Sequence, residues 1–212
     1  MIAKQNKNTE KLHIAVAGNI GSGKTTLTKL LSDHYNWIPQ FEAVTNNPYL
    51  QDYYSDIMRW SFNMEVYFLK ERFRNLLEME QSPKTFIQDR TIYEGVHVFV
   101  ANNYKQGHLS ERDFEAYMEL FGLMTDMVRY PDLMIYLRAS IPHLVSNIQK
   151  RGRDYEQAIQ IDFRVAVNSF ELQDGFFSLR QSKREGLPIF VITSNEPSGI
   201  DAALRFWGAR FA

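Results

Sequence analysis

A glycine-rich segment, residues 18–25, constrains the fold of this chain more than any other feature. Its letters GNIGSGKT match the pattern G-x-x-x-x-G-K-[ST], and the apolar run LHIAVA comes directly before it. Glycines let backbone N–H groups converge on phosphate oxygens, and a helix that begins there adds its partial positive charge. The segment therefore predicts a phosphate-binding loop between a buried strand and a helix. With the threonine that follows, the expected nucleotide contacts are Gly18, Asn19, Ile20, Gly21, Ser22, Gly23, Lys24, Thr25 and Thr26.

Three side chains, two in this loop and one at a later strand end, predict phosphoryl chemistry with ATP and Mg²⁺. Lys24 can place a positive charge on the β- and γ-phosphates, and the Thr25 hydroxyl can ligate Mg²⁺. Asp89 follows a short β-forming run, and an acidic residue at such a strand end is a common second ligand for the metal. We therefore expect ATP as the phosphate donor and Mg²⁺ held by Thr25 and Asp89.

Apolar runs alternate along the chain with segments of helical spacing, which is typical of a parallel sheet covered by helices. We expect an α/β, P-loop NTPase-type fold with about five strands, helices on both faces and a helical lid. No linker or repeat divides the sequence, so residues 1–212 are expected to form one domain, with residues 1–10 disordered. The expected strands are 12–17, 37–41, 85–88, 133–137 and 189–193, and the expected helices are 24–35, 60–80, 91–104 and 110–130.

The overall composition excludes several classes of partner. The formal net charge is −1, so no surface is expected to bind nucleic acid. Cysteine is absent, which excludes disulfides and thiolate zinc sites, and no apolar run approaches the roughly 20 residues that cross a bilayer. The five histidines show no ligand spacing. We expect a soluble, cytoplasmic protein without a membrane partner.

Beyond the phosphate loop, several short segments occur in an order that resembles one kinase family. A guanine-specific Asn-Lys-x-Asp motif is missing, and the chain is too small for most motor ATPases. The segments resemble the deoxynucleoside kinases, especially the bacterial purine deoxynucleoside kinases, over about residues 12–170. This resemblance implies transfer of the ATP γ-phosphate to the 5′-hydroxyl of a deoxynucleoside, and a homodimer. The segments are FE (41–42), NPYL (47–50), YY (53–54), WSFNME (60–65), DRTIYE (89–94) and RGRDYE (151–156).

Two residues at expected strand ends are candidates for the reaction itself. Glu42 ends the second strand, where ligands bind in open parallel sheets, and a carboxylate there can take the proton of the acceptor hydroxyl. The resemblance assigns Glu42 this role. Arg90 has a planar, permanently charged side chain. It suits contact with the 5′-oxygen of the acceptor, with a phosphate or with the carboxylate of the catalytic base.

The resemblance also implies contacts to the phosphates and the sugar. Arg151 and Arg153 match the arginines of a lid, here residues 151–158, which closes over the nucleotide and neutralises charge on the transferring group. Tyr54 and Glu156 match residues that bind the 3′-hydroxyl of the sugar.

Glu65 and Arg72 are expected to read the base. They lie seven residues apart, so they share one face of a helix. Many relatives carry glutamine at the first position. An ionised carboxylate only accepts hydrogen bonds. It therefore suits guanine, whose N1–H and N2–H are two adjacent donors, better than adenine. If Arg72 pairs tightly with Glu65, adenine could be preferred instead. Gly95 stands where several relatives carry an aspartate that pairs with the pocket arginine, and we expect it to enlarge the pocket.

Two other functions agree with the phosphate loop alone. A nucleoside monophosphate kinase of the thymidylate type would need cationic groups near the second strand, and residues 42–47 contain no arginine or lysine. A non-catalytic nucleotide-binding module would leave Glu42, Asp89 and the lid arginines without a shared purpose.

Overall fold

The fold is that of a computed structural model, which describes residues 11–42, 47–152 and 189–193. The expected disorder of residues 1–10 and most of the expected lid, residues 153–158, lie outside these described ranges.

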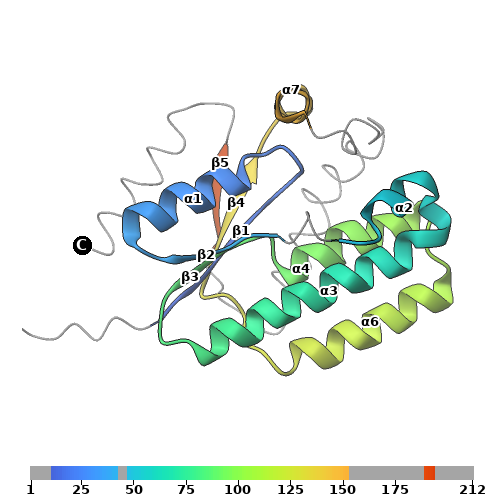
Figure 1. The fold of residues 1–212 in the computed structure, drawn as a ribbon, viewed down its shortest axis with the longest axis horizontal. Helices are drawn as coiled ribbons and strands as arrows, with labels where there is room; N and C mark the ends of the chain where they lie inside the picture. Colours follow the sequence, from blue (N-terminus) through green and yellow to red (C-terminus); the bar gives the residue numbers. More distant parts are fainter. Residues whose placement is uncertain (1–10, 43–46, 153–188, 194–212) are drawn as a thin grey trace, which may run out of the picture.

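One parallel sheet forms the centre of the molecule (Figure 1). Its strands follow the order β2-β3-β1-β4-β5, and every neighbouring pair is parallel. All residues of β1 are buried, as expected for a central strand covered on both faces. The bounds of the strands are β1 His13–Gly18, β2 Ile38–Gln40, β3 Phe86–Asp89, β4 Leu133–Arg138 and β5 Ile189–Thr193.

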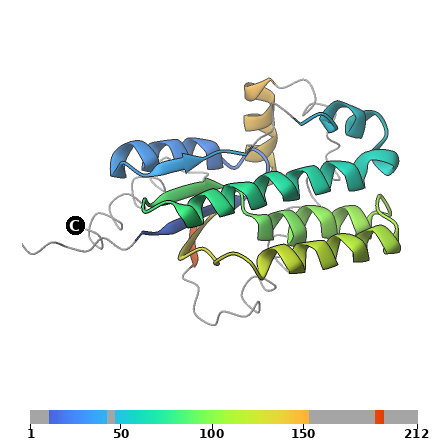
Figure 2. The same ribbon diagram turned by 60° about the horizontal axis from the view of Figure 1, so that its bottom comes forward.

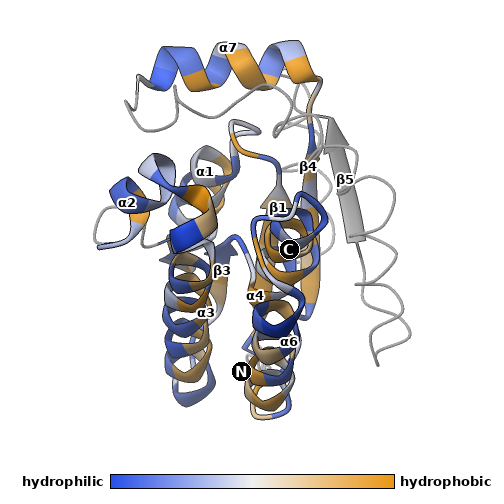
Figure 3. Ribbon diagram, turned by 90° about the vertical axis from the view of Figure 1, so that its right-hand side faces the viewer, coloured by the Kyte–Doolittle hydropathy of each residue, from blue (hydrophilic) through white to orange (hydrophobic). Residues whose placement is uncertain are grey.

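Helices cover both faces of this sheet, which confirms the expected fold class. Alternate residues of β1 point to opposite faces. Ile14 and Val16 pack with Leu27 and Leu31 of α1 (Lys24–Tyr35). Ala15 and Ala17 belong to the larger core on the other face, which α3 (Ile57–Gln81) and α6 (Glu111–Thr125) complete. In Figure 3 the apolar residues of α3 face the neighbouring helices, and its polar residues point outward.

The chain between β3 and α6 is one helical stretch with an unusual middle. It consists of α4 (Ile92–Glu94), the π-helical segment η1 (Gly95–Val100) and α5 (Ala101–Lys105), where the sequence predicted a single regular helix over residues 91–104. This stretch runs beside α3 (Figure 2). Periodicity alone did not predict the wider π turn, because the apolar spacing of so short a segment also fits an α-helix.

Three other helices differ from expectation. The sequence predicted no helix where α2 (Leu50–Ser55) and α7 (Ile141–Arg151) form. α2 is a short helix, and α7 begins with Pro142 in its first turn, where the missing N–H costs nothing. α6 ends at Thr125 and not at residue 130. Among the described residues, no helix is both long enough and apolar enough to cross a membrane.

Candidate active site

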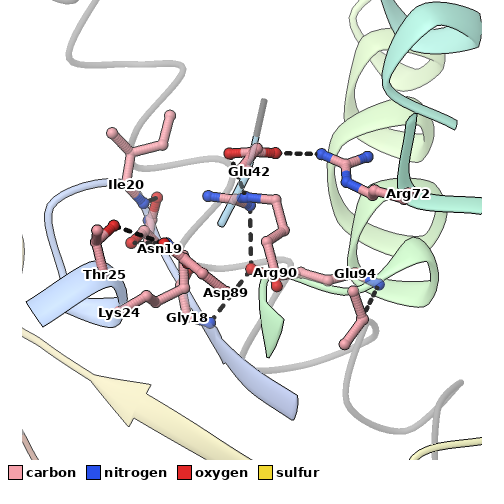
Figure 4. A network of polar contacts seen from close by, with 11 residues as sticks. Gly18, Asn19, Ile20, Lys24, Thr25, Glu42, Arg72, Asp89, Arg90 and Glu94 are labelled. Atoms are coloured by element: carbon pink, nitrogen blue, oxygen red, sulfur yellow. Dashed lines mark hydrogen bonds and ion pairs between the residues drawn. The ribbon is translucent and has the colours of Figure 1, made fainter. Parts of the chain in front are cut away.

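The phosphate loop joins the end of β1 to the start of α1, as the sequence predicts. Lys24 is buried within it, and its Nζ donates to the carbonyl oxygens of Gly18 and Asn19 at 2.7 and 3.0 Å. Gly23, Thr25 and Thr26 are exposed, so this end of α1 is accessible from solvent. The loop therefore combines a helix N-terminus, which favours anions, with an ammonium group that now donates to the loop's own carbonyl oxygens (Figure 4).

Two glycines of this loop lie too close to their neighbours to carry a side chain. A Cβ on Gly18 would stand 2.6 Å from the carbonyl oxygen of Leu137, and one on Gly21 would stand 2.8 Å from that of Leu144. Both residues also have positive φ, at 140° and 85°. The side chain of Asn147 holds this arrangement by donating to the Gly21 carbonyl oxygen at 2.8 Å. Helix α7 thus packs directly on the loop.

Thr25 and Asp89, the two residues expected to hold a metal, lie in contact. The Thr25 hydroxyl donates to Asp89 Oδ2 at 2.6 Å, although 64 residues separate them in the chain. A hydroxyl and a carboxylate beside a phosphate loop are the hard oxygen ligands that Mg²⁺ uses together with substrate phosphates and water. No cluster of three or more acidic, histidine or cysteine ligands occurs among the described residues.

Glu42 lies between two arginines (Figure 4). Its Oε1 accepts from Arg72 at 2.5 Å, and its Oε2 accepts from Nε of Arg90 at 3.2 Å. Burial alone would raise the pKa of Glu42, but the two guanidinium groups outweigh it and lower the pKa to about 2. The carboxylate is therefore ionised at neutral pH, and 19% of its side chain stays exposed to solvent.

Arg90 is held in an uncommon backbone conformation. Its φ is +70°, and its N–H donates to the carbonyl oxygen of Val16 on β1. From there the guanidinium reaches Glu42, lies 4.3 Å from the centre of the Phe99 ring and donates to Glu94 at 3.0 Å. These contacts fix the direction of the arginine at the end of β3.

Glu94 is a site residue that the sequence reasoning did not select. Its Oε1 accepts from Arg90 and also from the backbone N–H of Gly18 at 3.2 Å, while its Oε2 is buried without a hydrogen-bond partner in the described structure. One carboxylate thus joins the phosphate loop to the arginine beside Glu42. The signal in the sequence was its position four residues after Arg90 at the start of a helix, where the two side chains share a face.

Glu65 and Arg72 share a face of α3, but no hydrogen bond or ion pair is found between them in the described structure. Arg72 binds Glu42 instead, whereas Glu65 Oε1 accepts from Nδ2 of Asn103 at 3.0 Å. The amide oxygen of Asn103 in turn accepts from the Tyr53 hydroxyl at 3.4 Å. The tight Glu65–Arg72 pair that the sequence left open is therefore not what this structure contains.

Gly95 does not simply enlarge the pocket. A Cβ at this position would clash with Nη1 of Arg72, so the guanidinium itself fills the space beside the glycine. The sequence has glycine and not an acid at position 95, but it could not show that Arg72 would turn to Glu42. That choice depends on how α3 and η1 pack together.

The remaining candidates lie on α2, at the end of α7 or outside the described residues. Tyr54 is half-buried on α2, edge-on to the ring of Tyr53 at 5.2 Å between centroids. Arg151 is the last residue of α7, directly before the left-handed Gly152. Arg153 and Glu156 lie outside the described residues.

The chain is similar to known proteins over most of this region. The model of a family described as deoxynucleoside kinase matches residues 14–170. Deoxyadenosine/deoxycytidine kinase of Bacillus subtilis is 39% identical over 145 residues, which are 68% of this chain and 67% of that protein. Deoxyguanosine kinase of the same bacterium is 33% identical over 170 residues, 76% of this chain and 81% of its own length.

A solved structure shows the same similarity in three dimensions. Deoxyadenosine kinase from M. mycoides with bound dATP superimposes with a TM-score of 0.81 at 26% identity, covering 92% of this chain and 98% of that one. The segment that matches the family model contains every described candidate residue, from Gly18 to Arg151.

Proposed function

Since the chain belongs to the deoxynucleoside kinase family of ATP-dependent phosphotransferases, we propose that it transfers the ATP γ-phosphate to the 5′-hydroxyl of a purine deoxynucleoside. The observation that carries this proposal is the position of Glu42. An ionised carboxylate, paired with Arg72 and Arg90, lies beside a complete phosphate loop, and Glu94 links Arg90 to that loop.

The phosphate donor binds at the loop. Backbone N–H groups and Lys24 receive the β- and γ-phosphates and stabilise the charge that develops there. Thr25 and Asp89 would hold Mg²⁺, which when bound neutralises charge between these phosphates. The Thr25–Asp89 hydrogen bond supports this assignment, since it already brings the two ligands together.

The acceptor hydroxyl meets Glu42. Its proton passes to the carboxylate as the hydroxyl oxygen forms a bond to the γ-phosphorus, and the bond from that phosphorus to the bridging oxygen breaks to release ADP. A carboxylate with a pKa of about 2 is a weak base, so proton transfer occurs late, which suits a loose phosphoryl-transfer transition state. Arg90, on the same carboxylate, directs it and faces the 5′-oxygen.

Sugar, base and lid complete the proposed site. Tyr54 and Glu156 bind the 3′-hydroxyl, and Arg151 and Arg153 close over the phosphates from the lid. These roles are supported by the matching positions in the family segments. Glu65 reads the base, which is supported by its burial beside the same cluster. Arg72 contributes by orienting Glu42 as well as by facing the base.

We further propose that the enzyme is a cytoplasmic, single-domain homodimer. Two apolar side chains near the end of α6, Leu123 and Met127, are each 69% exposed. Exposed apolar residues often mark an interface, so they support a partner subunit at this place. Analytical ultracentrifugation of the whole chain tests the assembly, because a monomer at micromolar concentration would contradict it.

A coupled assay of ADP release tests the reaction. Each of the four deoxynucleosides, and thymidine monophosphate as a fifth acceptor, is supplied with ATP and Mg²⁺. We expect ADP release with a purine deoxynucleoside and none with the monophosphate. Release with the monophosphate alone would instead support a thymidylate-type kinase, and ATP binding without any release would support a nucleotide-binding module.

A further inference from the structure

The carboxyl group of Glu65 has an unusual environment. Its residue is only 3% exposed, and its single hydrogen bond in the described structure comes from the neutral amide of Asn103. The nearest cation on the same helix, Arg72, is bound to another carboxylate, Glu42. Glu65 is therefore a buried acid without a cation of its own.

Charged and titratable groups from several elements lie near Glu65. Burial raises the pKa of Glu65 to about 7, and the negative charge of Glu42 adds to this, while the positive charges of Arg72 and Arg90 act against it. The tyrosines nearby have raised pKa values, chiefly because they are buried, so they stay neutral. Among the described residues, the groups that interact electrostatically with Glu65 are Arg72 on α3, Glu42 after β2, Arg90 after β3, Tyr53 on α2 and Tyr117 on α6, while His108 after α5 contacts its partner Asn103.

Asn103 determines which oxygen of a neutral Glu65 carries the hydrogen. The amide oxygen of Asn103 accepts from the Tyr53 hydroxyl, so its Nδ2 is the atom turned toward Glu65. Because Nδ2 can only donate, Oε1 of Glu65 must be an acceptor. The hydrogen of the neutral acid then belongs on Oε2, for which the described structure contains no hydrogen-bond partner. A buried carboxylate with one neutral donor is costly, whereas the acid form is not.

We propose that Glu65 meets the base as a neutral carboxylic acid, with Oε2–H donating and Oε1 accepting, and that Asn103 is the residue that fixes this polarity. The inference rests on the proposed function and deepens it. A side chain that both donates and accepts matches a base edge with an amino group beside an unprotonated ring nitrogen. Among purines this is the N6–N1 edge of adenine, whose N1 an ionised carboxylate would repel. Guanine pairs with the neutral acid through O6 and N1–H and with the carboxylate through N1–H and N2–H, so the neutral form admits deoxyadenosine whereas the ionised form selects deoxyguanosine. The expectation that Glu65 is ionised, and so favours guanine, is replaced.

The pH dependence of base selection tests this proposal. The measurement is kcat/KM for deoxyadenosine and for deoxyguanosine from about pH 6 to about pH 8.5, in the native enzyme and in Glu65→Gln. In the native enzyme the adenine-to-guanine ratio falls roughly tenfold or more, since each pH unit above the pKa reduces the neutral fraction about tenfold. An amide donates and accepts at every pH and can pair with either purine, so in Glu65→Gln the ratio stays constant with pH.

A constant ratio in the native enzyme, or the same pH dependence in Glu65→Gln, would overturn the proposal. An infrared difference spectrum of native protein against Glu65→Gln gives a second readout that needs no turnover. At about pH 6 the native protein shows a carboxylic acid C=O band that the variant lacks, and the band disappears at about pH 8.5. If no deoxynucleoside is phosphorylated, the proposed function fails, and the infrared band still decides the protonation state of Glu65.

Discussion

At the scale of single residues, the site depends on carboxylates that are treated differently by their surroundings. Glu42 lies between two arginines, which lower its pKa to about 2 and so keep its carboxylate ionised at neutral pH. Glu65 lies a short distance along the same cluster with only an amide donor, and its pKa is about 7. Burial raises the pKa of both, so the difference comes from where Arg72 and Arg90 point.

Glu42→Gln is expected to lower kcat by about 10²–10⁴-fold with little change in KM, because the amide keeps the shape but cannot take the proton. Since the pKa of Glu42 lies near 2, its ionisation should cause no loss of native activity as the pH falls from about 8 to about 5. Steady-state kinetics check both points. Glu78→Gln, an exposed change on α3, is the matched control. An unaltered kcat would remove Glu42 from the mechanism.

Glu94→Gln is expected to raise KM for ATP and for the deoxynucleoside together. Glu94 Oε1 accepts from both Gly18 and Arg90, and hydrogen bonds to a charged group contribute about 1.5–3 kcal/mol, so kcat/KM should fall roughly tenfold or more for each substrate. The residual amide oxygen can still accept, which preserves the fold. A change in only one of the two KM values would show that Glu94 does not couple the two subsites.

At the scale of helices and strands, the π-helical segment lets two residues of its own stretch, Gly95 and Asn103, each meet a residue of α3. Gly95 lies against Arg72, and Asn103 binds Glu65, so α3 and the η1–α5 stretch run antiparallel. Asn103 lies eight positions after Gly95 on the η1–α5 stretch, whereas Arg72 lies seven positions after Glu65 on α3. In a regular α-helix the eighth residue would turn about 80° past two full turns. The wider π turn takes up this extra residue.

These element-level features mark the limit of prediction from the sequence. The phosphate loop, the Thr25–Asp89 pair and the candidate base Glu42 all follow from strand ends, which motifs and apolar runs identify well. The partner of Arg72, the role of Glu94 and the contact of Asn103 with Glu65 depend on how two helices pack. No spacing rule within one helix carries that information.

Helix α7 offers an element-scale prediction. Asn147→Ala is expected to raise KM for ATP about fivefold, because the loss of the hydrogen bond to Gly21 removes about 1 kcal/mol of support from the phosphate loop. Gln149→Ala, an exposed change on the same helix, should leave KM for ATP as it is. Isothermal titration with a non-hydrolysable ATP analogue compares the two variants. Equal affinities would mean that α7 does not support the loop through Asn147.

At the scale of the whole molecule, Glu65 makes stability depend on pH. Its pKa is raised from 4.5 unfolded to about 7 folded, so the folded state holds its proton over this window. Stability therefore falls as the pH rises from about 4.5 to about 7, in total by roughly 3 kcal/mol from this group. Glu65→Gln removes this loss.

Denaturant unfolding measures the expected effect. Glu65→Gln should be more stable than the native protein at about pH 8, by up to roughly 3 kcal/mol, and nearly equal to it at about pH 5. Glu78→Gln again serves as the exposed control. If the gain is the same at both pH values, ionisation of Glu65 is not its cause.

The division between sheet and helices also bears on how substrate range can change. The groups proposed to bind phosphates and metal lie at the ends of β1 and β3, whereas Glu65 and Asn103 lie on helices. Selection or design can therefore alter the accepted base without rebuilding the reaction centre. Arg72 is the exception, because it lies on the same helix as Glu65, the proposed base-reading residue, but its guanidinium binds Glu42. Any variant that recruits Arg72 for a new base gives up part of its catalytic support, so new specificities are easiest to obtain at Glu65 and Asn103.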